Sequence, residues 1–177
     1  MSKSMIRLIK VDSKYIRYLY SFDNHVMYNK GQKRPYIGIL FEVKGCKYYA
    51  PLSHPKPKFL TKENDVDFMR INGGRHGAIN FNNMIPVVDS AVEIMDVRNE
   101  QDFKYKLILI NQLQFFDDKE LDIINKATKL YKAYKTKKLR KKVMERCCDF
   151  VLLEKKSKLY NPNFKFDPKL KIPKQVK

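Results

Sequence analysis

The sequence contains few cysteines and no long apolar run. Its three cysteines, Cys46, Cys147 and Cys148, are odd in number and two are adjacent, which suits neither a disulfide framework nor a CxxC metal pair. Reduced thiols in a cytosol are the simpler interpretation. No stretch approaches the length of a membrane span, and the apolar run at residues 5–11 is too short and too interrupted for a signal peptide. We therefore expect a cytoplasmic protein.

The motifs of common enzyme classes are also absent. The chain has no GxxxxGK[ST] phosphate loop, no HExxH, no GxSxG and no paired Cys/His metal spacing, which argues against nucleotide hydrolysis and metal catalysis. The spacing of His25, His54 and His76 gives no support to a two-histidine ribonuclease. We expect no cofactor and no bound metal.

Acidic residues are scarce relative to basic ones. The chain has 37 Lys plus Arg against 19 Asp plus Glu, a net charge of +18, far more than solubility requires. From Lys126 to the C-terminus there are 18 basic and 4 acidic residues. Such a concentration favours a nucleic acid partner and steeply salt-dependent binding. The alternative is a lysine-rich helix that is simply solvated.

Length and periodicity predict one α+β domain. With 177 residues and 44% hydrophobic content, the chain fits one core, which we place at residues 1–160, followed by a basic extended tail at 161–177. Alternating apolar residues predict a strand at 5–10, a hairpin of 34–43 and 47–52 around Lys44-Gly45, and strands at 78–88 and 91–97. A helix capped by Asp12 or Ser13 should end near Asn24.

Helical spacing dominates the second half of the chain. We predict helices at 104–116 and 118–135 with a break near Asp117, a basic helix at 137–146 and an amphipathic stretch at 148–159. The apolar stripe of Phe103, Leu107, Ile110 and Leu113 is expected to be core. The candidate contacts to the RNA backbone come from the basic helical region: Lys126, Lys129, Lys137, Lys138, Arg140 and Lys141.

A proline-rich segment, PLSHPKPK at residues 51–58, follows the hairpin. Its prolines forbid a regular ladder, so we expect an ordered, exposed loop that carries Ser53, His54, Lys56 and Lys58. RNA cleavage needs little more than such a loop, because the 2′-OH of the substrate attacks the adjacent phosphorus and leaves a 2′,3′-cyclic phosphate. The protein must orient the attack, move a proton and stabilise charge on the phosphoryl oxygens.

Basic residues near the loop could stabilise that charge. Arg34, Lys33 and Lys56 are the candidates, and Arg34 is the best suited because its guanidinium is a planar fork. Crowding of Lys33, Arg34, Lys56 and Lys58 would also lower the pKa of one lysine and make it a plausible proton shuttle. The alternative is that these residues are ordinary surface charges.

Five segments in one order resemble the ToxN/AbiQ toxin family of type III toxin-antitoxin systems. They are KYIRYLYSFD, RPYIGILFEVKGCKYYAPLSHPKPKF, GAINFNNMIPVVDSAVEIMDV, YKLILINQLQFF and CDFVLLEKK, which together span about residues 6–156. The resemblance implies a MazF/Kid-like fold: a twisted antiparallel sheet, or partly open barrel, flanked by helices, with the active site in a groove on the sheet.

The resemblance also implies the residues of that groove. The family's motifs fall on Tyr15, Tyr28, Arg34, Ser53 and Lys56, and His54 replaces the second loop hydroxyl of the family. His54 has therefore either removed a hydrogen-bond donor or added an acid-base group. Tyr15 could instead be core, and Ser53 could be a turn hydroxyl that bonds its own backbone.

The resemblance implies a metal-independent endoribonuclease that prefers a sequence in single-stranded, A-rich target RNA. Its partner would be an antitoxin RNA of pseudoknot repeats, which the toxin processes and with which it assembles into a closed protein–RNA ring. Two other classes stay open. One is a non-catalytic module that binds structured RNA, and the weaker one is a peripheral membrane protein, although the basic helix lacks a matching wide apolar face.

Overall fold

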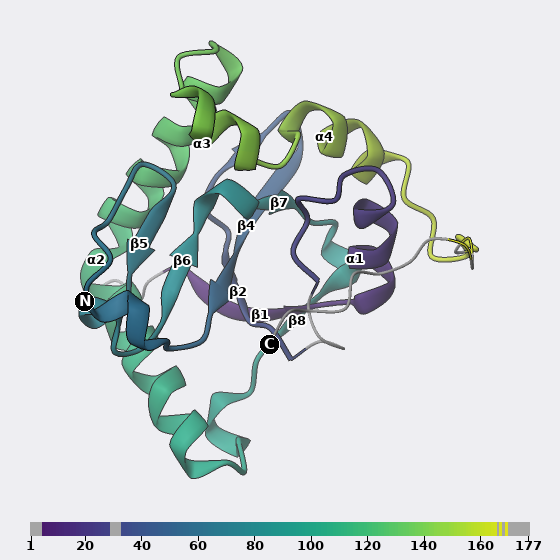
Figure 1. The fold of residues 1–177 in the computed structure, drawn as a ribbon. Helices are drawn as coiled ribbons and strands as arrows, with labels where there is room; N and C mark the ends of the chain where they lie inside the picture. Colours follow the sequence, from purple (N-terminus) through teal and green to yellow (C-terminus); the bar gives the residue numbers. More distant parts are fainter. Residues whose placement is uncertain (1–4, 29–32, 166, 168, 170–177) are drawn as a thin grey trace.

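An antiparallel sheet of eight short strands forms the centre of this computed structural model, which describes residues 5–28, 33–165, 167 and 169 (Figure 1). The strand order is β5-β6-β4-β2-β1-β8, and β3 and β7 pair with β4 off this path. The sheet is therefore open at β5 and β8. The strands are β1 (Arg7–Val11), β2 (Tyr36–Gly38), β3 (Glu42–Val43), β4 (Cys46–Ser53), β5 (Phe68–Arg70), β6 (Ala78–Asn80), β7 (Ile85–Pro86) and β8 (Val92–Ile94).

Strand β4 organises the sheet because it pairs with β2, β3, β6 and β7. The β3–β4 hairpin turns at Lys44 and Gly45, whose φ angles are 50° and 77°, as a two-residue turn of this kind requires. The predicted hairpin is thus confirmed. The prolines were expected to take residues 51–58 out of the sheet. Pro51 nevertheless pairs with Tyr36, and β4 continues to Ser53. Proline is tolerated because Leu52 supplies the next ladder bond, from its N–H to the carbonyl of Pro35.

In the described part of the chain, four α-helices surround the sheet. Helix α2 runs along the side of β5 and β6, while α1 and α4 lie together on the other side, next to β7 (Figure 1). Asp12 caps α1, as predicted, by accepting from the N–H of Lys14. The helices are α1 (Ser13–Tyr20), α2 (Phe103–Lys135), α3 (Lys141–Arg146) and α4 (Phe150–Lys158), and 3₁₀ turns lie at η1 (Pro57–Leu60), η2 (Asn72–Gly74), η3 (Phe81–Asn83), η4 (Asp89–Ala91) and η5 (Val97–Asn99).

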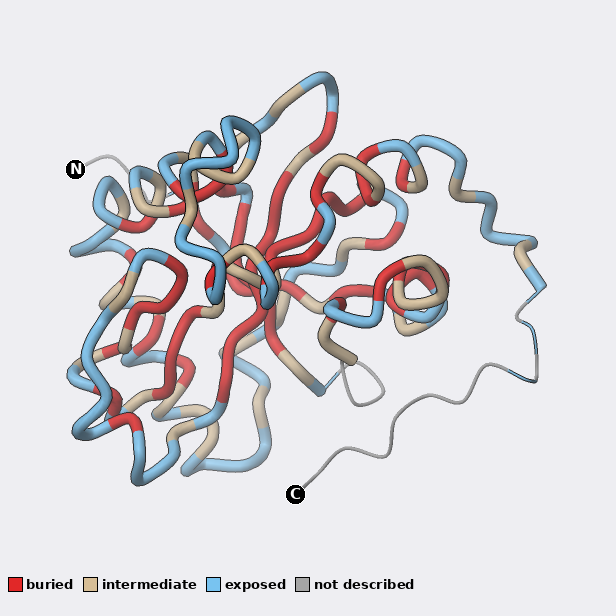
Figure 2. Tube along the Cα trace, turned by 45° about the horizontal axis from the view of Figure 1, so that its top comes forward, coloured by how far each residue is buried: buried red, intermediate tan, exposed pale blue. Residues whose placement is uncertain are grey.

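The core lies between the central strands and the inner faces of the helices (Figure 2). Aromatic rings fill much of it where β4, α2 and α4 meet. The ring of Tyr48 lies 5.4 Å from that of Tyr131 and 5.9 Å from that of Phe150, measured between centroids. Such large side chains supply much of the apolar area that a domain of this size can bury.

Three of the four residues of the apolar stripe predicted for the core face solvent instead, whereas Leu113 is partly buried against the core. Phe103 is 71% exposed, Leu107 44% and Ile110 46%. Helix α2 buries a neighbouring face of the same helical spacing, so periodicity alone could not choose between the two faces. The buried residues of that face are Leu109, Gln112, Phe116, Ile123, Ala127, Leu130 and Tyr131.

The break predicted near Asp117 is confirmed as a kink in α2 at Lys119, where φ is −117° and ψ is 17°. Other predicted boundaries were wrong. The basic helix at 137–146 begins only at Lys141, since Lys137 has a φ of 55°. The strand at 78–88 is split into β6 and β7 by η3, and β5 was not predicted.

The described part of the C-terminal segment packs on α1. Tyr160 lies 5.0 Å from the ring of Tyr18, and Phe164, beyond the predicted domain boundary at residue 160, lies 4.9 Å from the same ring. Apolar contacts therefore continue past that boundary, although the last part of the predicted tail, 170–177, lies outside the described residues. None of the described helices is long and apolar enough to cross a membrane.

Candidate functional site

Ser53 ends β4 at one edge of the core and is 8% exposed. Its Oγ accepts a hydrogen bond of 2.8 Å from the amide Nδ2 of Asn80, on β6. A Cβ atom at Gly77, whose φ is +98°, would lie 2.2 Å from the carbonyl oxygen of Ser53. A glycine is therefore needed at 77 for the chain to approach this strand end. Because Ser53 Oγ accepts from Asn80, its own hydrogen stays available to donate to a ligand.

Arg34 lies beside the same strand end. Its Nε donates to the carbonyl of Tyr28 at 3.1 Å, and its Nη1 donates to the carbonyl of Leu52 at 3.0 Å. Burial lowers the pKa of Arg34, yet a guanidinium stays charged in proteins. The structure thus fixes a cation one residue away from Ser53, and this cation has three further N–H groups for an anionic ligand.

The residues after Ser53 form the predicted ordered and exposed segment. His54, Lys56 and Lys58 are exposed, and the chain enters the 3₁₀ turn η1 at Pro57. The ammonium groups of Lys56 and Lys58 lie 5.9 and 5.8 Å from the centroid of the Phe59 ring, which is within the range of a cation–π contact. Two cations are therefore held on one turn, three and five residues beyond Ser53.

A pocket of 570 Å³ adjoins this strand end. It brings Lys33, from the segment before β2, together with His54, whereas Lys56 and Lys58, with which the sequence grouped Lys33, do not line it. The first residue that sequence reasoning missed is Tyr105 of α2, whose ring centroid lies 5.9 Å from that of His54. Nothing local in the sequence shows that the first turn of α2 returns to the loop after β4. Among the described residues, the lining comprises Lys10, Lys33, His54, Met95, Glu100, Asp102 and Tyr105.

The two predicted tyrosines occupy different environments. Tyr15 is fully buried, its hydroxyl donates to the carbonyl of Pro86 at 2.6 Å, and burial raises its pKa. The structure therefore gives Tyr15 a place in the core, without contact with solvent. Tyr28 is half-buried, and its carbonyl is the acceptor for Arg34. The predicted loop continues through residues 29–32, which lie outside the described residues.

The basic residues predicted to bind RNA from the C-terminal region differ in how the protein uses them. Lys126 donates to the carbonyl of Asp65 at 2.7 Å, and Arg140 binds both carboxylate oxygens of Asp65 at 2.7 and 2.9 Å. Lys141 lies 3.8 Å from Glu145 in an exposed pair. The other three predicted residues, Lys129, Lys137 and Lys138, are exposed.

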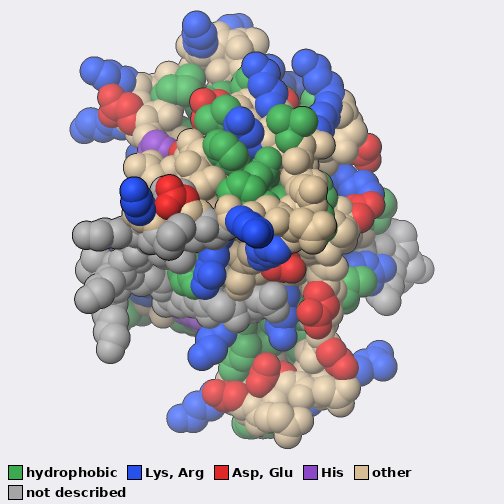
Figure 3. Space-filling model, turned by 90° about the vertical axis from the view of Figure 1, so that its right-hand side faces the viewer, with side chains coloured by type: hydrophobic (Ala, Val, Ile, Leu, Met, Phe, Trp, Pro, Cys, Tyr) green, Lys and Arg blue, Asp and Glu red, His purple; other side chains and the backbone are tan. Residues whose placement is uncertain are grey.

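These positive charges do not form one continuous helical surface, because residues 136–140 are not helical. On the face that carries α1 and α4, basic side chains are interspersed with acidic ones (Figure 3). The predicted basic helical region is therefore divided among α2, α3 and α4, with residues 136–140 outside any helix.

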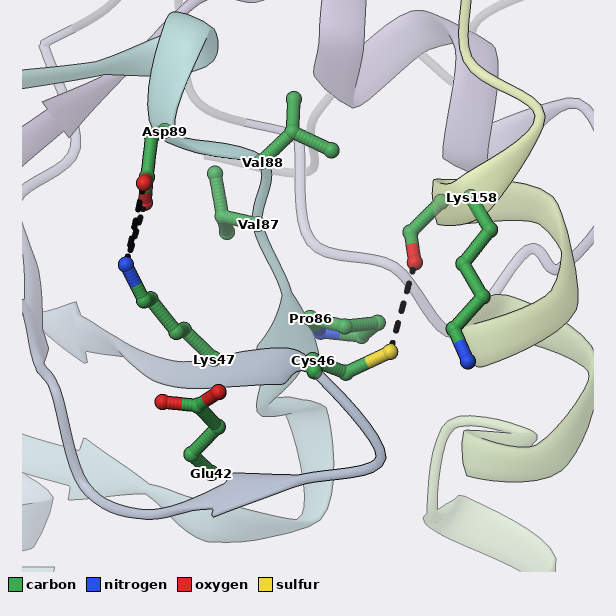
Figure 4. Close-up of a pocket in the computed structure, with 10 residues that line it drawn as sticks. Glu42, Cys46, Lys47, Pro86, Val87, Val88, Asp89 and Lys158 are labelled. Atoms are coloured by element: carbon green, nitrogen blue, oxygen red, sulfur yellow. Dashed lines mark hydrogen bonds and ion pairs between the residues drawn. The ribbon is translucent and has the colours of Figure 1, made fainter.

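A second pocket, of 380 Å³, lies at the opposite end of β4 (Figure 4). Its charges are balanced, because Lys47 pairs with Asp89 at 3.0 Å and Glu42 adds a second carboxylate opposite Lys158. Cys46 is buried there, with its Sγ 3.8 Å from Ser157 Oγ. With Arg34, Lys56 and Lys58 around it, the end of β4 that carries Ser53 is the more positive of the two. Within the described ranges, no group of three or more His, Cys, Asp or Glu is placed to hold a metal ion.

Known proteins resemble this chain over most of its length. It is 32% identical to the endoribonuclease ToxN of Pectobacterium atrosepticum over 161 residues, which is 85% of this chain and 91% of the relative. A solved structure described as AbiQ, a lactococcal anti-phage endoribonuclease of a type III toxin-antitoxin system, matches with a TM-score of 0.76 and 26% identity. That match covers 88% of this chain and 97% of AbiQ.

A further solved structure concerns selective toxin inhibition by a non-coding RNA pseudoknot in a type III system. It matches with a TM-score of 0.76 and 27% identity, over 88% of this chain and 97% of the other. The family described as "Toxin ToxN, type III toxin-antitoxin system" matches residues 7–158. The mixed fold with an open antiparallel sheet agrees with these structures. The chain therefore belongs to the ToxN family of endoribonuclease toxins of type III toxin-antitoxin systems.

Proposed function

We propose that this protein cleaves single-stranded, A-rich RNA at preferred sequences by attack of a 2′-OH on the adjacent phosphorus, without a metal ion. The observation that carries the proposal is the junction at the end of β4. Arg34 binds the carbonyl of Leu52, so a fixed cation lies next to Ser53, and His54 and Lys56 follow within three residues. This arrangement suits a phosphodiester, whose charge grows on the phosphoryl oxygens during the reaction.

Each residue has a defined part in this proposal. The amide of Asn80 donates to the Oγ of Ser53, so the hydroxyl hydrogen of Ser53 is left to donate to a phosphoryl oxygen or to the ribose. Arg34 and Lys56 stabilise the pentacoordinate transition state, and the half-buried Tyr28 borders the ribose. Tyr15 has an indirect part only: its hydroxyl bonds Pro86 at the other end of β4, so it would support the pocket through the packing of the core. His54 exchanges the proton, since imidazole is the side chain suited to this task near neutral pH.

The proposed partners are a target RNA and an inhibitory antitoxin RNA. Support comes from the matched structure in which an RNA pseudoknot inhibits the toxin. We infer that repeats of such a pseudoknot bind the same site, that the toxin processes them, and that a closed protein–RNA ring forms. The protein would then act in the cytoplasm of a bacterium, where release from the RNA arrests growth and limits phage.

Two structural expectations belong to the same proposal. The sheet would be a MazF/Kid-like core, a view supported by its antiparallel pairing and flanking helices. The catalytic domain would comprise residues 1–160, with 161–177 as a basic tail that adds charge for RNA binding.

An RNA digest tests the proposal. Purified protein is incubated with mixed RNA in excess EDTA, and the new ends are analysed for 2′,3′-cyclic phosphate. The parent should produce such ends, and Ser53→Ala or Lys56→Ala should lower the rate about 100-fold or more, the usual effect of removing a group that stabilises the transition-state charge. Lys155 is an exposed lysine on α4. Lys155→Ala therefore serves as the control for Lys56→Ala, because both variants remove one positive charge.

Three results would contradict parts of the proposal. Intact RNA that is nevertheless bound tightly would favour the non-catalytic RNA-binding module. Cleavage only after a divalent ion is supplied would refute metal independence. Full toxicity of His54→Ala in cells would exclude the acid-base role of His54 while leaving the phosphate site intact.

A further inference from the structure

The 570 Å³ pocket beside His54 has two walls of opposite charge. Lys10 of β1 and Lys33, which directly precedes Arg34 in the chain, form what we call the cationic wall. Glu100 and Asp102, just before α2, form the anionic wall. No ion pair among the described residues joins the two walls. A pocket built only for phosphate would gain nothing from the carboxylates, so the anionic wall calls for another kind of ligand group.

Backbone hydrogen bonds hold both carboxylates in place. Glu100 Oε1 accepts from the N–H of Asp102 at 3.0 Å, and Asp102 Oδ1 accepts from the N–H of Tyr105 at 3.1 Å as the N-cap of α2. Each carboxylate keeps a second oxygen, and a carboxylate accepts from several donors at once. The wall is thus a preorganised pair of acceptors for N–H groups.

Tyr105 provides an independent sign that a ligand is missing. Its hydroxyl is buried and has no hydrogen-bond partner among the described residues, a costly state that folded proteins generally avoid. Burial and then the charge of Glu100 raise the pKa of Tyr105, so the hydroxyl keeps its hydrogen as a donor. The ring also lies 5.9 Å from that of His54, at an angle of 54°. Two aromatic faces therefore border the pocket.

We propose that this pocket is a nucleobase subsite that selects a base carrying an exocyclic amino group, adenine or cytosine rather than uracil. The subsite rests on the proposed function, because the base would belong to a nucleotide next to the phosphate at Arg34 and Ser53. Its amino group donates to the second oxygens of Glu100 and Asp102. Its ring lies against Tyr105 and His54, as unpaired bases commonly lie on aromatic side chains, and Lys10 and Lys33 bind the flanking phosphate.

The chemistry of the bases explains the expected choice. Adenine and cytosine present an amino group next to a ring nitrogen that accepts, so Tyr105 can donate to the base while the carboxylates accept from it. Uracil presents carbonyl oxygens at both sides of its single N–H, and these would face the negative wall. A carbonyl opposite the half-buried carboxylate of Glu100 would displace water without supplying a donor, which disfavours the wrong base.

Binding of short RNAs tests the subsite without relying on cleavage. Fluorescence anisotropy measures the Kd of labelled A₈, C₈ and U₈ for a protein carrying Ser53→Ala, so that the RNA stays intact. We expect A₈ and C₈ to bind about tenfold tighter than U₈, as one base-specific set of hydrogen bonds allows. Adding Glu100→Gln should reduce this ratio to about twofold. Glu93→Gln, an exposed carboxylate on β8, removes the same charge outside the pocket and should leave the ratio unchanged.

Tyr105→Phe separates a ligand contact from a structural role. The hydroxyl has no partner to lose, so its removal should leave Tm unchanged or raise it, while binding of A₈ should weaken by about three- to tenfold. If Glu100→Gln keeps the parent ratio, or if Tyr105→Phe leaves binding unchanged, the subsite is refuted. If the base preference is present but the unsubstituted protein cuts no RNA in EDTA, the metal-independent nuclease proposal fails and the subsite stands.

Discussion

Glu154 on α4 joins three elements of the core through one carboxylate. It is 7% exposed, and its Oε1 accepts hydrogen bonds of 2.6 Å from the hydroxyls of both Tyr48 and Tyr131. Burial, followed by the hydrogen bond to this carboxylate, raises the pKa of both tyrosines. The hydroxyls therefore remain donors over the whole physiological pH range.

Removal of this acceptor should destabilise the fold. Glu154→Ala leaves two buried hydroxyls unpaired and a cavity between β4, α2 and α4, so we expect a loss of about 3–5 kcal/mol in the free energy of unfolding. Glu154→Gln keeps the side-chain volume and one acceptor oxygen, so it should lower the free energy of unfolding by less than Glu154→Ala. Urea unfolding followed by circular dichroism measures both. Equal stability of Glu154→Ala and the parent would show that the tyrosines find other partners.

Several site residues could be predicted from the sequence because they are close to one another along the chain. Ser53, His54 and Lys56 share one proline-rich segment, and Arg34 opens the strand that pairs with β4. Asn80 and Tyr105 could not be found in this way. They reach the site from β6 and α2, and only the folded chain places Nδ2 of Asn80 2.8 Å from Ser53.

At the level of elements, an ion-pair cluster fastens the β5 segment to the region around α3. Asp67, 2% exposed, accepts from Nε and Nη2 of Arg146 at 2.5 and 2.8 Å. Asp65 binds Arg140 in a more exposed pair, with side chains 38% and 68% exposed. The two pairs use the same kinds of group but differ in burial, and Arg146 also lies 3.6 Å from a carboxylate oxygen of Asp65.

The two arginines should differ in their effect on stability. Arg146→Ala leaves the buried carboxylate of Asp67 unpaired and should cost about 3 kcal/mol or more, whereas Arg140→Ala removes an exposed pair and should cost at most about 1 kcal/mol. Thermal and urea unfolding of the two variants, measured together, provide the test. Similar losses for both variants would mean that Asp67 gains water or another donor once Arg146 is removed.

Element boundaries show where sequence patterns stop being informative. The β3–β4 hairpin was predictable because Lys44-Gly45 sits between two apolar alternating runs, and the geometry of such turns is local. The buried face of α2 was not, because Leu109 and Phe116 share the helical spacing of the exposed Phe103 and Ile110. Which stripe is covered depends on the sheet against which the helix packs.

For the molecule as a whole, net charge indicates a nucleic acid partner but not the surface that binds it. The basic residues of the last third do not act as one group, since Lys126 and Arg140 are bound to Asp65. Lys129, Lys137 and Lys138 are exposed. If these exposed lysines contact RNA, they add affinity without sequence preference, whereas the pocket near His54 would supply the preference.

Salt dependence can locate the contacted phosphates. For single strands the logarithm of the binding constant falls with the logarithm of salt by about 0.7 per phosphate neutralised, so combined replacement of Lys129, Lys137 and Lys138 by Ala should reduce the slope by about 2. Arg140→Ala should leave the slope nearly unchanged, because the carboxylate of Asp65 already neutralises its guanidinium. Anisotropy titrations of a mixed-sequence RNA over a range of KCl concentrations measure both slopes. A slope unaffected by the triple replacement would instead place the contacted phosphates on the side of Lys10, Lys33 and Arg34, and would confine RNA binding to the end of β4.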